Sequence, residues 1–87
     1  MGGSTANALA TVLAELAGSH QVIAITHLAQ VAVLADAHYT VTKTAGDAPE
    51  TILAPVTGDA RVAEVARLLS GTATETSLAH ARELLRQ

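Results

Sequence analysis

The sequence predicts a small α/β layered protein, and three patterns indicate this fold class. Residues 4–17 and 60–70 carry apolar side chains at the three- and four-residue spacing of amphipathic helices. Residues 22–25 form a short apolar run without alternation, which is typical of a strand covered on both faces, as in a parallel sheet. Residues 38–43 alternate as in a strand with one face wetter than the other. The expected order is α-β-α-β-β-α-α within one unit, residues 1–87.

Two helices are expected in the N-terminal half. Ser4 or Thr5 provides an N-cap for the helix over residues 4–17, and Gly18 is a stop signal after it. A second helical pattern covers residues 28–35, directly after the first predicted strand. The apolar stripe of the first helix consists of Leu9, Val12, Leu13 and Leu16.

The middle of the chain predicts a β-hairpin. The strand over residues 38–43 is followed by a stretch rich in turn-forming residues, 44–50, and by a returning strand over residues 51–56. Pro55 has no N–H to donate to a neighbouring strand, so the second strand is expected to lie at an edge or to end there.

The C-terminal third predicts two further helices. Asp59 is the expected N-cap of the helix over residues 60–70, and Gly71 follows it as a stop. Thr74 is expected to cap a last helix that begins near Glu75. Its inward-facing residues are expected to be Leu78, Ala81, Leu84 and Leu85.

Composition limits the core and excludes several classes of protein. Of the 49% hydrophobic residues, 19 are Ala, which leaves 24 larger apolar side chains and a thin core. The absence of Cys excludes a disulfide framework, a thiolate nucleophile and a Cys-based zinc site. A formal charge of −3 without a Lys/Arg cluster argues against a nucleic-acid surface on this chain by itself. The most apolar stretch is shorter than the roughly 20 residues that span a bilayer.

The most informative local pattern is the apolar run that ends in Thr26 and His27. Ligands of open α/β sheets bind outside the carboxyl ends of the strands, where a His donates to a phosphate or orients a water. The alternative is a structural role in which His27 caps the helix that follows. No metal site is expected, because none of the four His residues is three or four positions from another.

Other arrangements that carry chemistry are absent from the sequence. Ser19 and His20 are adjacent, but no G-x-S-x-G elbow occurs. No phosphate-binding G-x-x-x-x-G-K-[ST] loop occurs either, and the single Lys, Lys43, lies in a predicted strand. The arginines of the two last helices alternate with Glu residues, which is typical of a solvated helix face: Arg61, Arg67, Arg82 and Arg86.

Several segments, taken in order along the chain, resemble the C-terminal end of the RecN family of bacterial DNA repair ATPases. They begin with Gly2-Gly-Ser-Thr-Ala and Gln21-Val-Ile-Ala-Ile-Thr-His-Leu-Ala-Gln-Val-Ala. They continue with His38-Tyr-Thr-Val-Thr-Lys, Arg61-Val-Ala-Glu-Val-Ala-Arg-Leu-Leu-Ser-Gly and Ala79-His-Ala-Arg-Glu-Leu-Leu. The resemblance covers nearly all 87 residues. It implies the C-terminal lobe of an SMC-like, ABC-type (P-loop NTPase) head domain that begins at the end of the D-loop, without the Walker A, signature and Walker B motifs.

The resemblance also implies roles for individual residues. His27 matches the switch histidine that reaches the γ-phosphate of ATP, and Thr26 would hold the end of its strand. Gly2 and Gly3 resemble the tail of the D-loop. The family often has Pro where this sequence has Ala29, a departure that leaves His27 in place but is expected to loosen the turn after it.

The implied activity needs more polypeptide than this chain. ATP and Mg²⁺ would bind a complete head, and this chain alone is expected to be inactive because the Walker A Lys and the Mg²⁺-holding residues are missing. The implied partners are the rest of the head and a second head, with DNA in the full-length context and no membrane. The implied location is the cytoplasm, at the nucleoid. The resemblance implies that neighbouring strands of the complete head are absent from this chain, which would leave strand edges unpaired. We therefore expect strands 22–25 and 39–42 to pair directly or the chain to self-associate.

Two other functions remain open from the sequence. One is a non-catalytic α/β module that works through protein contacts alone. The other is an independent phosphate-binding or hydrolase domain, for which no set of base, nucleophile and oxyanion donors is evident.

Overall fold

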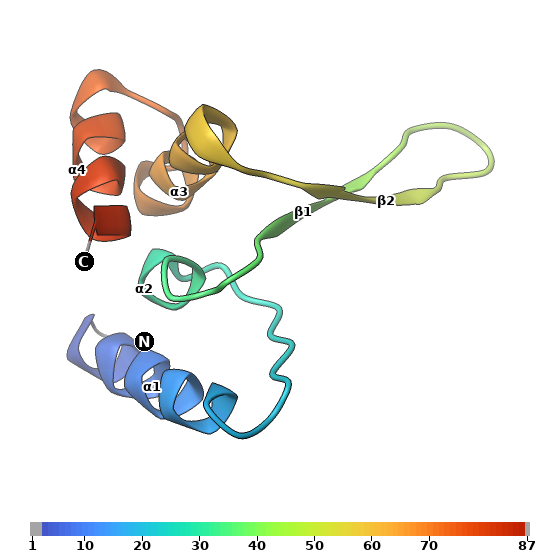
Figure 1. Cartoon of the computed structure of the whole chain (residues 1–87). Helices are drawn as coiled ribbons and strands as arrows, with labels where there is room; N and C mark the ends of the chain where they lie inside the picture. The colour runs from blue at the N-terminus through green and yellow to red at the C-terminus, as the bar shows by residue number, and fades with distance from the viewer. Residues whose placement is uncertain (1–2, 87) are drawn as a thin grey trace.

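The computed structural model describes residues 3–86 and combines helices with a two-stranded antiparallel sheet (Figure 1). Helix α1 covers Gly3–Ala17 and the short helix α2 covers Ala29–Ala32. Strands β1 (Tyr39–Lys43) and β2 (Thr51–Pro55) form the hairpin. Helices α3 (Gly58–Ser70) and α4 (Glu75–Arg86) complete the described part of the chain. The α/β class is confirmed, in the order α-α-β-β-α-α.

The predicted strand over residues 22–25 is wrong. Residues 21–26 run from α1 to α2 without a strand partner in the part of the chain that the structure describes. Ile23 and Ile25 are 85% and 96% exposed and Ala24 between them is exposed as well, so the run is not covered as the prediction required. A strand needs hydrogen-bonding neighbours, and the hairpin strands pair only with each other. Direct pairing of this segment with residues 39–42 is therefore also absent from the described structure.

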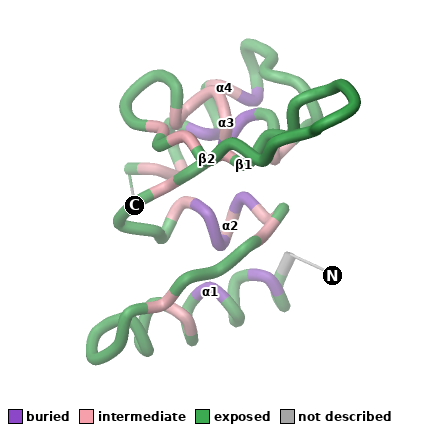
Figure 2. The backbone as a smooth tube through the Cα atoms, turned by 90° about the vertical axis from the view of Figure 1, so that its right-hand side faces the viewer, coloured by how far each residue is buried: buried purple, intermediate pink, exposed green. Residues whose placement is uncertain are grey.

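The predicted hairpin is confirmed. Its register places Val41 opposite Leu53 and Tyr39 opposite Pro55, which is the last residue of β2. Neither face of the hairpin is buried, so the expectation of one drier face for β1 is wrong: Tyr39 and Val41 are exposed and Thr40 is half-buried. Figure 2 shows the hairpin almost wholly exposed, and Figure 1 shows it extending away from the helices.

Helices α3 and α4 form the best-packed part of the molecule. Thr57, and not Asp59, is the N-cap residue of α3, and Asp59 lies within the first turn. Gly71 ends α3 with a φ of 82°, a left-handed conformation that favours glycine. The predicted Thr74 cap is confirmed, since the backbone N–H of Ser77 donates to Thr74 Oγ1 at 3.1 Å.

Small side chains make up most of the core. Val65, Ala66 and Ala81 are completely buried between α3 and α4, and Ala29 of α2 joins them. Leu78 and Leu85 of α4 pack against this cluster as predicted. Helix α2 thus lies between the pair α3–α4 and helix α1, which packs mainly against α2.

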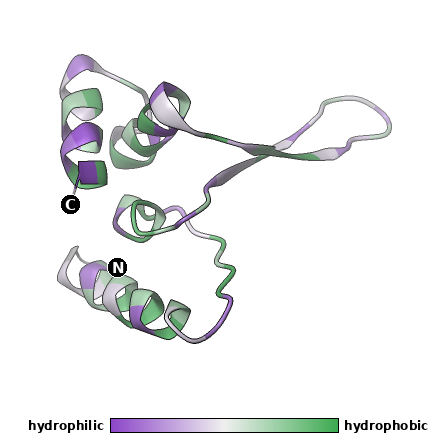
Figure 3. Cartoon of the chain, viewed as in Figure 1, coloured by the Kyte–Doolittle hydropathy of each residue, from purple (hydrophilic) through white to green (hydrophobic). Residues whose placement is uncertain are grey.

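Much apolar surface remains outside this core. Figure 3 shows hydrophobic segments along α1 and the connection that follows it, and these segments include the exposed Leu9, Val12 and Leu16 of α1. The predicted helix over residues 28–35 is shorter than expected, since α2 has four residues and Leu34 is 48% exposed. No helix among residues 3–86 is long and apolar enough to cross a membrane.

Candidate functional site

Thr26 and His27 lie at the turn that leads into α2. The backbone N–H of Leu28 donates a hydrogen bond to Thr26 Oγ1 at 3.0 Å, which closes the turn around His27. Leu28 then adopts an extended conformation, with φ −98° and ψ 118°, before the helix begins. Thr26 is half-buried and His27 is exposed. The side chain that stabilises the turn is therefore Thr26, and the His27 ring is left facing solvent.

A capping role for His27 finds no support in this geometry. The N-cap position of α2 is occupied by Leu28 and forms no side-chain hydrogen bond. Within residues 3–86, no hydrogen bond involves the His27 ring, whereas Thr26 Oγ1 accepts one. An exposed imidazole at a fixed turn is free to approach a ligand supplied from outside this chain.

The other end of α2 is held by Arg61 of helix α3. Arg61 Nη2 donates to three backbone carbonyl oxygens: those of Ala32 at 3.2 Å, Val33 at 3.4 Å and Ala35 at 2.8 Å. The last carbonyls of a helix have no intrahelical partner, and a cation near them also interacts favourably with the helix dipole. Together with the packing of Ala29 against the α3–α4 core, this guanidinium holds α2, and with it the turn of His27, against α3.

This role of Arg61 corrects the prediction of a wholly solvated arginine face. Arg61 is half-buried and its Nε has no hydrogen-bond partner in the described structure. Arg67 fits the prediction, because its Nε donates to Glu64 Oε2 at 3.0 Å on the helix surface. Each of the two arginines lies three residues from Glu64, Arg61 before it and Arg67 after it. The two arginines differ in that Arg61 lies beside α2, whereas Arg67 lies on the open surface of α3.

His38 lies close to Arg61 at the base of the hairpin. Its burial lowers its pKa below the ordinary value, and the positive charge of Arg61 lowers the pKa further. The carboxylate of Glu64 acts in the opposite direction on His38. The pKa of Glu64 is itself lowered, chiefly by the hydrogen bonds from Arg67. His38 was not singled out by its sequence position, and its Nδ1 is buried without a partner among the described residues.

The remaining candidates do not gather around His27. Gly3 is the first residue of α1, and Gly2 lies outside the described residues. Ser19 Oγ and His20 Nδ1 are 2.9 Å apart in the exposed turn after α1. Across residues 3–86 no three His, Asp or Glu side chains are close enough together to hold a metal ion.

The fold and the turn define a small α/β structure that presents an exposed histidine before a short helix and leaves much apolar surface uncovered. At the sequence level, this piece is 52% identical over 88 residues to DNA repair protein RecN of Treponema pallidum, 46% identical over 86 residues to that of Deinococcus radiodurans and 37% identical over 87 residues to that of Bacillus subtilis. These alignments cover 98–99% of the chain. The 87 residues thus correspond to the C-terminal segment of RecN proteins.

The chain spans about 15% of the length of these relatives. No protein-family model matches it.

Proposed function

We propose that this chain is the C-terminal lobe of a RecN-like ATPase head that acts in DNA double-strand-break repair and recombination. The observation that carries the proposal is the 37–52% identity to RecN proteins over nearly the whole chain. The α/β character and the exposed His27 beside a closed turn support it.

In this proposal His27 is the switch histidine. Phosphoryl transfer depends on positioning and on stabilising negative charge on the phosphate oxygens. The imidazole of His27 would donate a hydrogen bond to the γ-phosphate of ATP or orient the attacking water. Thr26 would keep the turn closed through its hydrogen bond with Leu28, so that the ring meets the phosphate in one orientation.

Arg61 acts in this proposal as a positioning residue. It contacts no reacting group, but its bonds to three carbonyls hold α2 in place directly after the His27 turn. Loss of these bonds would let α2 move and would displace His27 from the phosphate, and a displacement of about 1 Å is enough to lower a catalytic rate by roughly 10²-fold.

The rest of the ATP site must come from outside this chain. The sequence has no phosphate-binding loop, and its single Lys lies in β1. The residues described here also supply no cluster of carboxylates for Mg²⁺, so they do not fit the ion on their own. The chain would contribute His27, and through the Gly2–Gly3 segment the end of the D-loop, to a site completed by the remainder of the head.

Exposed surface supports the proposed partners, which are the rest of the head and a second head. A compact monomer of 8.8 kDa is expected to expose about 4,800 Å². This chain exposes 6241 Å², an excess of about 1,500 Å², whereas one side of a standard interface buries about 800 Å². The exposed apolar side chains include Ile23, Ile25 and several positions of α1, which supports their burial against other polypeptide in this proposal. The same surfaces would promote self-association of the isolated chain.

Reconstitution tests the proposed ATPase role. The missing N-terminal part of the head is mixed with the 87-residue chain, and ATP hydrolysis is measured with and without DNA. The proposal expects hydrolysis only in the mixture. It also expects His27→Ala to abolish hydrolysis, while His80→Ala, a change at an exposed position of α4, leaves it intact.

A non-catalytic interaction module is the second candidate function, and the extent of exposed apolar surface favours it. The two functions differ in one outcome. If the mixture forms a stable complex but His27→Ala leaves its ATP hydrolysis unchanged, the chain acts through contacts alone.

A further inference from the structure

The hydrogen bonds of the hairpin fix which backbone groups of β1 face outward. At the base of the hairpin, the N–H of Val56 donates to the carbonyl of His38 at 2.9 Å. At the loop, the N–H of Thr44 donates to the carbonyl of Glu50 at 2.8 Å. Bonded and non-bonded pairs alternate along antiparallel strands. The bonded pairs between these ends are therefore every second pair of the register: Thr40–Ala54 and Thr42–Ile52.

Three residues of β1 present backbone donors and acceptors on its outer edge. They are Tyr39, Val41 and Lys43, which belong to the non-bonded pairs and turn their N–H and C=O groups away from β2. Within residues 3–86, the sheet has no third strand and none of these three N–H groups donates to another residue. All three residues are exposed. An open edge of this kind is a template for a further strand.

The outer edge of β2 is less suited to pairing. Its outward positions are Thr51, Leu53 and Pro55, and Pro55 has no N–H to donate. Proline is one of the residues that natural edge strands use against pairing with another chain. The two edges of the hairpin are therefore not equivalent, and β1 offers the complete one.

The sequence of β1 is complementary to itself in the antiparallel direction. A two-fold axis at Val41 places Val41 opposite its own copy and Tyr39 opposite Lys43 of the other copy. These are the residues with outward backbone groups, so each such pair exchanges two hydrogen bonds. The Lys43 ammonium then lies beside the Tyr39 ring, and Thr40 lies opposite Thr42. Lys43 is the only charged residue of β1, so no like charges face each other.

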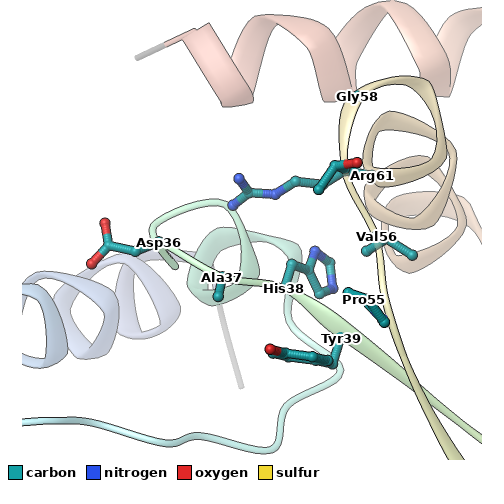
Figure 4. A pocket seen from close by; sticks show the side chains of 9 residues that line it. Asp36, Ala37, His38, Tyr39, Pro55, Val56, Gly58 and Arg61 are labelled. Atoms are coloured by element: carbon teal, nitrogen blue, oxygen red, sulfur yellow. The ribbon is translucent and has the colours of Figure 1, made fainter.

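The same arrangement joins the apolar faces of two hairpins. Tyr39, Val41 and Leu53 share one face and are 56%, 58% and 67% exposed. In Figure 4 the His38 ring lies on the side of Arg61, whereas the Tyr39 ring lies on the opposite side of the strand. The base of the hairpin therefore leaves Tyr39 available. A two-stranded hairpin alone is only marginally stable, and added strands with a common hydrophobic face stabilise it.

We propose that two copies of this chain pair through the outer edges of their β1 strands. The product is a four-stranded antiparallel sheet of order β2–β1–β1–β2 with Val41 at the two-fold axis. This contact uses no residue of the His27 turn and none of the exposed run 22–25, so it is independent of the proposed ATPase role.

Site-specific cross-linking tests the proposal, because a single strand pair buries less surface than a standard interface and associates weakly. The chain contains no Cys, so one introduced Cys reports one position. Val41→Cys would place two Cα atoms about 5.5 Å apart across the axis, within the range of a disulfide. Leu53→Cys is the matched control. It lies opposite Val41 on the same face, but the proposed sheet separates it from its copy by about 14 Å.

We expect oxidation to cross-link Val41→Cys at least about tenfold faster than Leu53→Cys, as followed by non-reducing gel electrophoresis. Equal rates for the two variants would indicate random collisions or packing of the hairpin faces, and would overturn the proposal. Absence of a cross-link in Val41→Cys would overturn it as well, since the edge then pairs with no second copy.

Hydrogen exchange of the unmodified chain provides a second measurement that needs no variant. Raising the protein concentration is expected to slow exchange of the Tyr39, Val41 and Lys43 amides. The slowing reaches about tenfold when roughly nine-tenths of the chain is paired, because only the unpaired fraction exchanges. The amides of Thr51 and Leu53, on the other edge of the same hairpin, are the internal controls. Equal slowing at both edges, or slowing at neither, would contradict the proposal.

Discussion

Arg61 Nη2 donates a hydrogen bond at 2.8 Å to the carbonyl oxygen of Ala35, 26 residues earlier in the chain. The bond joins the first turn of α3 to the segment that directly follows α2, on the other side of the hairpin in the sequence. It lies beside two weaker bonds from the same nitrogen to Ala32 and Val33. The position of the His27 turn therefore depends on a residue of a different helix.

Arg61→Ala is expected to destabilise the chain by about 1–3 kcal/mol, because the carbonyls at the end of α2 lose their shared donor and the Arg61 stem no longer packs. Urea unfolding followed by circular dichroism measures the change. Arg82→Ala, at an exposed position of α4, is the control and is expected to change stability by less than about 0.5 kcal/mol. Equal effects of the two variants would show that the α2 contacts contribute nothing.

Thr74→Ala is expected to cost about 1 kcal/mol, because the Ser77 backbone N–H at the start of α4 loses its side-chain acceptor. Thr72→Ala is a matched control in the same connection, since only the backbone oxygen of Thr72 accepts hydrogen bonds there. Thermal unfolding of both variants provides the comparison. A Thr74→Ala variant as stable as Thr72→Ala would contradict the assigned cap.

Stability is expected to fall as the pH is lowered from about 7 to about 5, and His38 contributes to this fall. Its pKa is lowered in the folded chain, so the unfolded chain binds its proton first and is favoured as pH falls below the unfolded value of about 6.5. Arg61 and Glu64 are the charged groups that act on it, in opposite directions. His38→Gln should flatten the dependence of the urea midpoint on pH over this range, in a buffer without phosphate or carboxylate. His80→Gln, at an exposed position of α4, is the control variant for the loss of a histidine.

Glu64 adds a second acid-sensitive contribution at lower pH. The Arg67 hydrogen bonds lower its pKa in the folded state, so its stabilisation is present above the unfolded pKa of the carboxyl and is lost as pH falls through the folded value. The pair lies on the helix surface, where such ion pairs contribute a few tenths of a kcal/mol. Glu64→Gln should therefore lower stability slightly at neutral pH and not at pH 3. A loss of equal size at both values would point to packing as the cause.

Ile25→Lys is expected to reduce self-association of the isolated chain without lowering its stability as a monomer. Ile25 is 96% exposed, so the new charge replaces no internal contact but opposes burial of this segment against another chain. Sedimentation velocity over a range of concentrations measures the effect. Ala24→Lys places the same charge one residue earlier, on the other side of an extended segment. Persistence of the association in Ile25→Lys would exclude residues 22–25 from the contact.

Local patterns predicted the hairpin and helices α1, α3 and α4 well, because their determinants lie within a few residues. The Thr74 cap, the Gly71 stop and the end of β2 at Pro55 are all features of short segments. The strand over residues 22–25 was predicted from apolar residues alone, and its hydrogen-bonding partner is not among the described residues. Hydrophobicity indicates that a segment prefers burial but does not supply the neighbour that buries it.

The site was predicted less completely. The Thr26–His27 turn follows from adjacent residues, although the role of His27 toward ATP stays a prediction. The contact of Arg61 with α2 was not predicted from the sequence, because the spacing of Arg61 from Glu residues matches that of a surface arginine. Its function as a link to α2 depends on packing between segments far apart in the chain, for which a single sequence carries no local signature. The same holds for His38, whose burial results from the approach of α3.

The backbone of the hairpin enters and leaves at one place, where the N–H of Val56 donates to the carbonyl of His38 at 2.9 Å. Beyond this closure, strands β1 and β2 and the loop between them contact chiefly each other and extend away from the helices. Paired insertions or deletions in the two strands would therefore lengthen or shorten the hairpin without moving α2 relative to α3. The fold thus separates a part whose length is free to vary from a part whose geometry is fixed.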